Sequence, residues 1–331
     1  MPRDIVVNGR FLARRVTGNE RYGREILRHF KNEHRVEQTC AQGILGHAWE
    51  QFILPTKLKR DSILWSPANS GPLAIQNQAL TIHDLSPLEH PEWFTRSYSA
   101  WYCLFLPMLA KRVRVIFTPS EYVKQKVMKR FGVRNVIVTP NGVDTSVFRP
   151  ETKHGVIDFP KKYILFVGSL QPRKNLEGLM VAWHRVKDKF ADTWLVVAGD
   201  SGHVFRSVKF FADERIRFLN YVSEEELSAL YVNAELFVLP SFDEGFGLPA
   251  LEAMACGTPV IVSDGGALPE TVGEAGLVFH LEEADSLAQA IENCLSDENL
   301  RKSLSEKGLT RAKSFSWQNT ADLIWKILNE L

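Results

Sequence analysis

Short apolar segments alternate with longer amphipathic ones along most of the chain. In the first half, apolar segments predict strands at residues 4–8, 79–83, 115–118 and 135–139, and amphipathic segments predict helices at residues 20–30 and 121–131. This alternation is typical of a parallel sheet whose strands are joined by crossover helices.

A polar stretch at residues 148–160, with Pro150, Gly155 and Pro160, resembles a linker, and a second alternating series follows it. Its predicted strands lie at residues 163–167, 194–198, 216–219, 236–239 and 259–262, and its predicted helices lie near residues 176–189, 223–233, 248–256 and 317–331. We therefore expect an α/β protein with two Rossmann-like, doubly wound domains facing a cleft. The expected domains are residues 1–155 and 156–315, with a terminal helix at 316–331 that packs back on the first. Ligands in such folds bind beyond the carboxyl ends of the strands.

Composition favours a soluble globular protein. Of the 331 residues, 45% are hydrophobic and 24% are charged, which suffices for two cores. The longest apolar run, residues 101–110, is far shorter than the ~20 residues of a membrane span and contains Pro107. The four cysteines form no CxxC pair, so we expect reduced thiols in a cytoplasmic protein.

Charge is distributed unevenly although the formal net charge is only +1. Residues 1–150 hold 22 Lys and Arg against 12 Asp and Glu, and the remainder holds 18 against 27. The first half could meet an anionic partner, or the two halves could simply have solvated surfaces of opposite sign.

One segment could bring the first half to a membrane. Within residues 98–115, aromatic and apolar side chains precede a basic cluster: Trp101, Tyr102, Phe105, Leu106, then Lys111, Arg112 and Arg114. Aromatic side chains beside cations can rest on an anionic membrane, here the inner face of the plasma membrane. The alternative is a buried helix with a charged end.

The densest chemical signal is the string PSFDEGFGLPALEAMACGTP at residues 240–259. Glycines allow a tight turn after a buried strand, Pro249 suits the first turn of a helix, and Gly257 suits its end. The free N–H groups near Phe246, Gly247 and Leu248 could then bind a phosphate with help from the helix dipole. Glu244 and Glu252 could accept hydrogen bonds from a sugar hydroxyl and a ribose. The alternative is a capped helix with two surface glutamates.

A second cluster, FVGSLQPRKN at residues 166–175, follows a predicted strand. Gly168 permits close backbone approach, and Asn175 can cap the next helix. Arg173 and Lys174 could stabilise a departing diphosphate without a metal. No aspartate pair of metal-binding type stands out, because Asp84, Asp200, Asp243 and Asp264 lie in different loops.

The first domain offers weaker signals. In Thr-Ile-His-Asp-Leu at residues 81–85, His83 could hydrogen-bond a sugar hydroxyl and Asp84 could accept a proton from an acceptor; the alternative is that both fix a loop. Two further loops could border a donor site, although such positions are as often plain turns: Gly265, Gly266 and Glu270, and Asn220, Tyr221 and Val222.

These motifs resemble glycosyltransferase family 4. The string EGFGLPALEAMACGTPV is similar to the E-x7-E signature of that family, and HDLSPLEHPEWF, TPSEYVKQKV and TPNGVD resemble bacterial mannosyltransferases of polysaccharide biosynthesis within it. The resemblance implies a retaining, metal-independent enzyme with the GT-B fold.

The resemblance also implies residue roles. The first glutamate, Glu244, would approach the donor hexose, and the second, Glu252, would bind the ribose. The amides of Phe246, Gly247 and Leu248, with Arg173 and Lys174, would hold the diphosphate. Further residues expected at the donor are Gly168, Ser169, Tyr221, Val222 and Gly18, the last in a loop similar to the glycine-containing acceptor loop of the family but with one glycine where many members have two.

The expected reaction moves a hexose from a nucleotide sugar to a saccharide or lipid-linked saccharide of a surface polysaccharide or lipopolysaccharide. The resemblance favours GDP-mannose, with UDP-linked hexoses next, and implies no nucleic-acid partner and no cofactor. Three alternatives stay open: a nucleotide-sugar epimerase, a phosphorylase-type enzyme and a non-catalytic sugar-nucleotide binding protein. A NAD dehydrogenase is disfavoured because no GxGxxG motif follows a strand.

Overall fold

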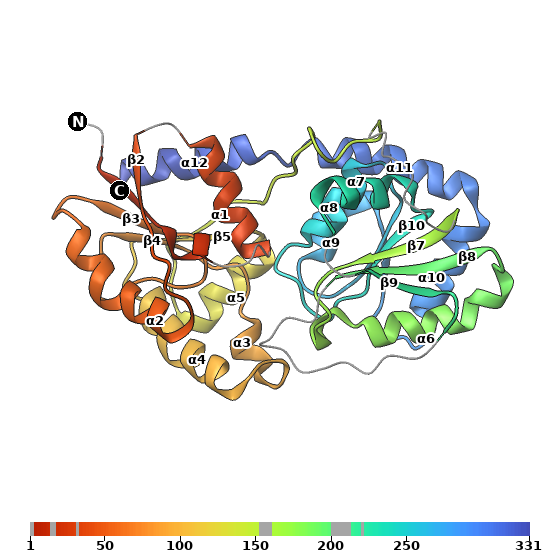
Figure 1. The fold of residues 1–331 in the computed structure, drawn as a ribbon, viewed down its shortest axis with the longest axis horizontal. Helices are drawn as coiled ribbons and strands as arrows, with labels where there is room; N and C mark the ends of the chain where they lie inside the picture. The colour runs from red at the N-terminus through yellow and green to blue at the C-terminus, as the bar shows by residue number, and fades with distance from the viewer. Residues whose placement is uncertain (1–2, 14–17, 31–32, 152–160, 200–212, 220–221) are drawn as a thin grey trace. The chain divides into compact units, whose positions relative to one another are not determined.

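A computed structural model describes residues 3–13, 18–30, 33–151, 161–199, 213–219 and 222–331. The chain divides into two compact units (Figure 1). The first unit contains residues 1–91, 96–142 and 316–331, and the second contains residues 92–95 and 143–315. Each unit has a six-stranded sheet in which every pairing is parallel, so each is described by itself.

The sheet of the first unit has the strand order β2-β1-β3-β4-β5-β6. Its strands are β1 (Ile5–Asn8), β2 (His34–Glu37), β3 (Ile63–Ser66), β4 (Gln78–Thr81), β5 (Val115–Thr118) and β6 (Val136–Val138). The four central strands are buried along their whole length, as expected for a parallel sheet covered on both faces. The strand order reverses between β1 and β3, which is where doubly wound sheets bind ligands.

Helices cover both faces of this sheet (Figure 1). The first unit has η1 (Gly9–Ala13), α1 (Gly18–His29), α2 (Gly43–Ala48), η2 (Trp49–Ile53), η3 (Leu54–Lys57), α3 (Ser86–Glu89), α4 (Arg96–Ala110), α5 (Glu121–Phe131) and α12 (Trp317–Glu330). On one face α12 packs against α1, with the Tyr22 and Trp317 ring centroids 5.9 Å apart and those of Phe30 and Trp325 5.2 Å apart. On the other face α4 and α5 bury Leu80, and η3 buries Leu64.

The sheet of the second unit has the order β12-β11-β10-β7-β8-β9. Its strands are β7 (Lys162–Val167), β8 (Thr193–Ala198), β9 (Ile216–Leu219), β10 (Leu236–Leu239), β11 (Val260–Ser263) and β12 (Leu277–Phe279). Counted within the unit, this is the 3-2-1-4-5-6 order of the Rossmann fold. The order reverses between β7 and β10, so the loops that follow these two strands meet at the expected ligand position.

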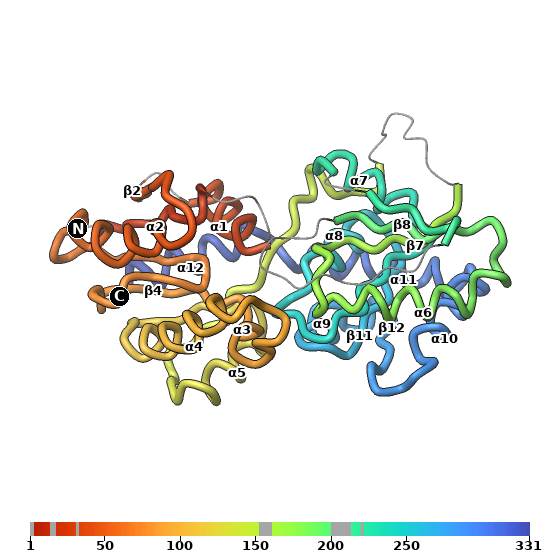
Figure 2. The backbone as a smooth tube through the Cα atoms, turned by 60° about the horizontal axis from the view of Figure 1, so that its bottom comes forward, coloured from red at the N-terminus to blue at the C-terminus, as the bar shows by residue number. Residues whose placement is uncertain are grey.

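The helices of the second unit also lie on both faces of its sheet (Figures 1 and 2). They are η5 (Pro172–Lys174), α6 (Leu176–Val186), η6 (Lys187–Lys189), α7 (Glu224–Asn233), α8 (Leu248–Ala255), α9 (Leu268–Val272), η7 (Gly273–Ala275), α10 (Ser286–Ser296) and α11 (Glu298–Ala312), while η4 (Pro91–Trp93) lies where the chain passes between the units. Trp183 of α6 and Ile291 of α10 are fully buried in the core against one face.

The segment expected to meet a membrane folds mostly inward. Tyr102 and Leu106 of α4 are buried in the core of the first unit and Trp101 is half-buried against that core, while the half-buried Phe105 stacks on Trp101 with ring centroids 3.7 Å apart. Tyr102 and Leu106 thus match the alternative of a buried helix with a charged end, and membrane contact by this segment stays a prediction. No helix among the described residues is long and apolar enough to cross a bilayer.

Candidate functional site

Two loops of the second unit are joined at the point where its strand order reverses. One loop follows β7 and leads through η5 into α6, and the other follows β10 and leads into α8. The backbone N–H of Phe242 donates to the carbonyl of Arg173 over 2.8 Å, and the side chain of Asn175 donates to the carbonyl of Pro240 over 3.0 Å. Asn175 also caps α6 by accepting from the N–H of Gly178, as the sequence predicts. The two loops therefore form one rigid frame.

Glu244 is the centre of this frame and is held by three side chains. Lys174 Nζ donates to its Oε1 over 2.5 Å, Ser241 Oγ donates to the same oxygen over 2.7 Å, and Arg173 lies 3.3 Å from its Oε2. Glu244 and Lys174 are each only 6% exposed. A buried pair of this kind is retained only when its hydrogen bonds are satisfied.

The two cations decide the protonation state of Glu244. Burial alone would raise the pKa of its carboxyl group, but the charges of Lys174 and Arg173, with the hydrogen bonds from Lys174 and Ser241, outweigh burial and lower the pKa to about 2. Glu244 is therefore ionised at neutral pH, and it neutralises much of the positive charge of its two partners.

A third loop, which follows β11, fixes the backbone of Glu244. The N–H of Ala267 donates to the Glu244 carbonyl over 2.8 Å, and Ser263 Oγ donates to the carbonyl of Ser241. A Cβ on Gly266, which has φ 72°, would lie 2.3 Å from the carbonyl oxygen of Glu244, so only glycine fits there. The sequence placed Gly265 and Gly266 beside the donor site only weakly; the structure shows that this loop packs on the Glu244 loop.

Helix α8 begins where the sequence predicts, immediately after Gly247. Gly247 has φ 94°, a left-handed conformation, and a Cβ there would lie 2.5 Å from a methyl group of Leu268. Pro249 stands in the first turn, and Gly257, with φ 79°, follows the last. Phe246 and Leu248, on either side of Gly247, have buried side chains, which leaves their backbone amides as the groups able to meet a ligand.

Glu252 lies on α8 and is 3% exposed. The hydroxyl of Tyr231, on α7, donates to its Oε2 over 3.1 Å. Because Glu244 and Glu252 are both buried, the alternative of two surface glutamates on a capped helix is wrong.

Gln171 orients one of the two cations, which the sequence did not reveal. Its Oε1 accepts a hydrogen bond from Arg173 Nε over 3.0 Å, and its amide nitrogen donates to Ser169 Oγ. Gly168 donates to the carbonyl of Ala198 over 3.0 Å, which ties the loop start to β8. Val222 directly precedes Ser223, the cap of α7. Asn220, Tyr221 and Asp200 lie outside the described residues.

In the first unit, His83 is held in one orientation at the end of β4. Its backbone N–H donates to Asn69 Oδ1 over 2.7 Å, and its Nε2 lies 2.7 Å from the carbonyl oxygen of Pro67. Burial lowers the pKa of the ring, although the bond to Pro67 and the charges of Asp84 and Glu20 act in the opposite direction. A neutral ring that donates from Nε2 has Nδ1 as a hydrogen-bond acceptor.

Comparison with known proteins agrees with this geometry. The sequence profile of glycosyl transferases group 1 matches residues 149–311, and that of Glycosyltransferase Family 4 matches residues 65–147. The O-antigen chain mannosyltransferase B of Escherichia coli is 32% identical over 274 residues, which cover 78% of this chain and 72% of that protein. The chain belongs to glycosyltransferase family 4.

One further relative and two solved structures are also similar to this family 4 glycosyltransferase. The O-antigen chain mannosyltransferase RfbU of Salmonella typhimurium is 31% identical over 227 residues, 66% of this chain and 61% of that protein. Among solved structures, sucrose-phosphate synthase from Thermosynechococcus elongatus has a TM-score of 0.76 at 19% identity and covers 99% of this chain and 98% of that one. HepE of Anabaena in complex with UDP-glucose has a TM-score of 0.76 at 16% identity, with full coverage of both chains. The predicted GT-B fold is thereby confirmed.

Asp84 and Gly18 are the other two residues of the first unit that the sequence analysis placed at the site. Asp84 is partly buried, and its Oδ1 accepts from the N–H of Ser86 over 3.0 Å, which fixes the turn into α3. Gly18 is the first residue of α1, and a Cβ there would meet no atom within 4 Å. Residues 14–17, which precede it, lie outside the described residues.

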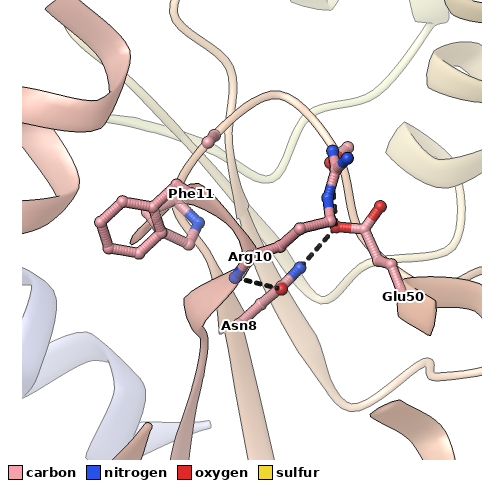
Figure 3. Close-up of a pocket in the computed structure, with 7 residues that line it drawn as sticks. Asn8, Arg10, Phe11 and Glu50 are labelled. Atoms are coloured by element: carbon pink, nitrogen blue, oxygen red, sulfur yellow. Dashed lines mark hydrogen bonds and ion pairs between the residues drawn. The ribbon is translucent and has the colours of Figure 1, made fainter. Parts of the chain in front are cut away.

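A small polar pocket of the glycosyltransferase lies at the carboxyl ends of β1 and β3 (Figure 3). Arg10 and Asn8 both donate to Glu50 Oε1, over 3.1 and 2.7 Å, and Arg10 also donates to Ser70 Oγ over 2.6 Å. Arg10 is 4% exposed and Glu50 is 1% exposed. Sequence reasoning missed this pair, because nothing in the sequence connects two charged residues forty positions apart. The ion pair between Arg10 and Glu50 holds η1 in place.

Across the described part of the chain, no three His, Cys, Asp or Glu side chains come together in a group suited to a metal ion. The two glutamates of the candidate donor site, Glu244 and Glu252, accept hydrogen bonds from Lys174 and Tyr231. Metal independence therefore stays a prediction.

Proposed function

We propose that this enzyme transfers a hexose from a nucleoside diphosphate to a saccharide acceptor with retention of anomeric configuration. The observation that carries the proposal is the cluster of Lys174 and Arg173 around the buried Glu244, at the strand-order reversal of the second sheet. Two cations beside the amino end of α8 form a site for a pyrophosphate.

The groups at this site would act on different parts of the donor. Arg173, Lys174 and the amides near Gly247 would hold the diphosphate. Glu244, already in contact with both cations, would accept a hydrogen bond from a hexose hydroxyl, and Glu252 would accept one from the ribose. Because these donors and charges are fixed by the fold, they need no reorganisation as negative charge grows on the leaving group.

The proposed chemistry proceeds on one face of the sugar. The bond between the anomeric carbon and the phosphate oxygen breaks, and an oxocarbenium-like centre forms. The acceptor hydroxyl oxygen bonds to the same face, and its proton passes to the departing phosphate oxygen. The nucleoside diphosphate then leaves. In the first unit, neutral His83 would accept a hydrogen bond from a sugar hydroxyl through Nδ1, and Asp84 stays a candidate for contact with the acceptor.

For the donor we propose GDP-mannose, with UDP-linked hexoses as the next class. The support is that two relatives, which match 78% and 66% of the chain, are named O-antigen mannosyltransferases. For the acceptor we propose a lipid-linked saccharide of O-antigen or a similar surface polysaccharide.

A nucleotide-release assay tests the proposal. The protein is incubated with GDP-mannose, UDP-glucose or UDP-N-acetylglucosamine, each with and without a lipid-linked oligosaccharide, and free nucleoside diphosphate is measured. We expect acceptor-dependent release with GDP-mannose and an α-linked product by NMR. Release of UDP only would replace the donor, a β-linked product would remove the retaining mechanism, and no transfer to any acceptor would contradict the proposed function.

A further inference from the structure

An exposed aromatic side chain lies on the loop that carries Glu244. Phe242 is 46% exposed, although every other residue from Pro240 to Leu248 is buried. A single exposed apolar side chain is ordinary on a protein surface. Phe242, however, precedes the buried Glu244 by two residues, so its ring meets solvent at the edge of the candidate donor site.

The backbone that carries Phe242 is held by the neighbouring loop. The N–H of Phe242 donates to the carbonyl of Arg173 over 2.8 Å. Asn175 donates to the carbonyl of Pro240 over 3.0 Å, and Arg173 Nη1 donates to the carbonyl of Asp243 over 3.2 Å. The residues before and after Phe242 are therefore fixed as well, and the exposure of its ring follows from how the two loops are joined.

The loop after β11 closes the other side of this backbone. A Cβ on Gly265 would lie 2.3 Å from the carbonyl oxygen of Ser241 and 2.6 Å from that of Phe242. Only a glycine allows the two backbones to approach so closely. The segment that presents the Phe242 ring is thus bonded on one side and closely packed on the other.

Trp93 extends the aromatic surface. It lies in η4, within residues 92–95, which belong to the second unit although the chain on either side belongs to the first. The ring centroids of Trp93 and Phe242 are 6.3 Å apart and their planes differ by 24°. At this separation two nearly parallel rings are offset, so neither covers the whole face of the other. We name these two side chains the aromatic platform.

We infer that the aromatic platform binds a sugar ring of the acceptor saccharide, an inference that rests on the proposed transfer to a saccharide. A pyranose ring has hydroxyl groups around its edge and C–H groups on its faces. The C–H groups carry partial positive charge, and the faces of aromatic rings carry partial negative charge, so the two surfaces attract each other while apolar area is buried.

The position of the aromatic platform favours the acceptor over both parts of the donor. Glu244, which is proposed to meet the donor hexose, is only 6% exposed, whereas the ring of Phe242 faces solvent. The nucleobase would be attached to the ribose, which is proposed to meet Glu252, on α8. The base would therefore lie on the far side of the hexose from Phe242.

Saccharide binding and transfer kinetics of the full chain together test the role of Phe242. Soluble trisaccharides of mannose, galactose or N-acetylglucosamine serve as probes in saturation-transfer NMR with GDP present. Phe242→Leu should weaken binding of the preferred trisaccharide about five- to tenfold and raise its KM equally, because the aromatic face is lost. Phe242→Tyr keeps that face and should bind within about twofold of the wild type.

Two readouts separate a saccharide contact from a general defect. GDP affinity and the turnover number at saturating acceptor should stay within about twofold of the wild type in Phe242→Leu, because its side chain is proposed to touch neither the phosphates nor the reacting atoms. Phe218→Leu changes another exposed phenylalanine of the same unit, 43% exposed on β9, and should leave saccharide binding unchanged. Trp93→Leu should weaken binding, and Trp93→Phe should weaken it less.

Several outcomes would overturn the inference. They are a wild type that binds none of the three trisaccharides, a Phe242→Leu variant that binds them as well as the wild type, and a loss of GDP affinity in that variant, which would assign the ring to the nucleobase. Transfer with an unchanged acceptor KM in Phe242→Leu would leave the proposed function and remove the aromatic platform. Saccharide binding that depends on Phe242, without transfer from any donor, would do the reverse.

Discussion

At the scale of single residues, Glu244 pairs with the same two cations that are proposed to bind the diphosphate. It neutralises Lys174 and Arg173 while no diphosphate is bound, with its pKa lowered to about 2. In the proposed function, a diphosphate would bring further negative charge to the same two cations. Donor binding would then require the cations to divide their contacts between Glu244 and the phosphates, which would lower donor affinity but keep the cations ordered beforehand.

Glu244→Gln should consequently bind a nucleoside diphosphate more tightly than the wild type, by about three- to tenfold, because a repelling charge is removed. Transfer should fall by about a hundredfold, because the variant lacks the carboxylate that is proposed to meet the hexose. Calorimetry with GDP and the nucleotide-release assay measure the two effects. Glu274→Gln, at an exposed position in the same unit, is the control. Weaker GDP binding in Glu244→Gln would show that the carboxylate helps to hold the diphosphate.

His83 should make stability depend on pH. Its pKa is lowered by burial from the ordinary value of 6.5, so below that pH the unfolded chain takes up a proton more readily than the folded one. The contribution of His83 is therefore complete above pH 6.5 and is lost as the pH falls toward its folded pKa. Urea unfolding of His83→Asn should show a smaller loss of stability between pH 7 and pH 5.5 than the wild type shows.

His280 provides a control of opposite sign. It is exposed and lies 3.0 Å from Asp264, whose hydrogen bond raises its pKa. Its contribution is present below pH 6.5 and is lost as the pH rises through the raised pKa. Replacing His280 with Asn should therefore steepen the loss on acidification. If both variants changed the profile in the same direction, burial would not be the cause of the His83 effect.

At the scale of elements, some segments were predicted with their final bounds. The strands at residues 115–118 and 236–239 are fully buried apolar runs. The helix at residues 121–131 is bounded by residue types that favour its two ends, Ser120 as the N-terminal cap and Gly132 in a left-handed conformation after the last turn. In contrast, β2 is a half-exposed edge strand of sequence HRVE, which has no apolar pattern, and β12 is apolar but has only three residues, too few to show a period. Such strands are defined by their neighbours, which a single sequence does not show.

The sequence also predicted the motif residues of the candidate site but not the contacts between its loops. The order of glycines, proline and glutamates identified the loop before α8, and Arg173 and Lys174 followed a strand and a glycine. The contacts of Ser241 and Gln171 and the N–H of Ala267 were not predicted, because each depends on how separate loops pack. The Arg10–Glu50 pair was missed for the same reason.

The start of α8 gives a test of loop packing. Gly247→Ala should destabilise the protein by about 2–3 kcal/mol, because it combines a left-handed backbone with a Cβ that collides with Leu268. Gly132→Ala has a similar φ, 69°, but open space around its Cβ, and should cost about 1 kcal/mol. Chemical unfolding measures both. Equal costs would mean that Leu268 moves aside freely and that the start of α8 is not rigidly held.

The contact between α7 and α8 gives a second test. Tyr231→Phe removes the hydroxyl that bonds Glu252, so the carboxylate should lose its fixed position and nucleoside diphosphate affinity should fall several-fold. Tyr163→Phe removes a buried hydroxyl that bonds the carbonyl of Leu230 and should affect stability alone. Calorimetry with GDP distinguishes the two variants, and an equal loss of affinity in both would argue against a role for Glu252 at the ribose.

At the scale of the whole molecule, the chain passes from the first unit to the second after Gly142 and returns after Phe315. The two passages lie side by side, because the N–H of Val143 donates to the carbonyl of Phe315 over 3.2 Å. A Cβ on Gly142 would lie 2.1 Å from the nitrogen of Trp317. The last helix, α12, thus completes the first unit although the whole of the second unit precedes it in the sequence.

This arrangement predicts that the stability of one unit can be changed without loss of ligand binding by the other. Trp317 is 4% exposed and packs on Tyr22, so Trp317→Ala should cost about 3–5 kcal/mol and lower the melting temperature of the first unit. The proposed diphosphate groups all lie in the second unit, so GDP affinity at low temperature should stay within about twofold of the wild type. Scanning calorimetry with and without GDP measures both effects, because a ligand raises the melting temperature of the unit that binds it. If GDP affinity in Trp317→Ala fell in proportion to the lost stability, nucleotide binding would depend on the integrity of the first unit as well.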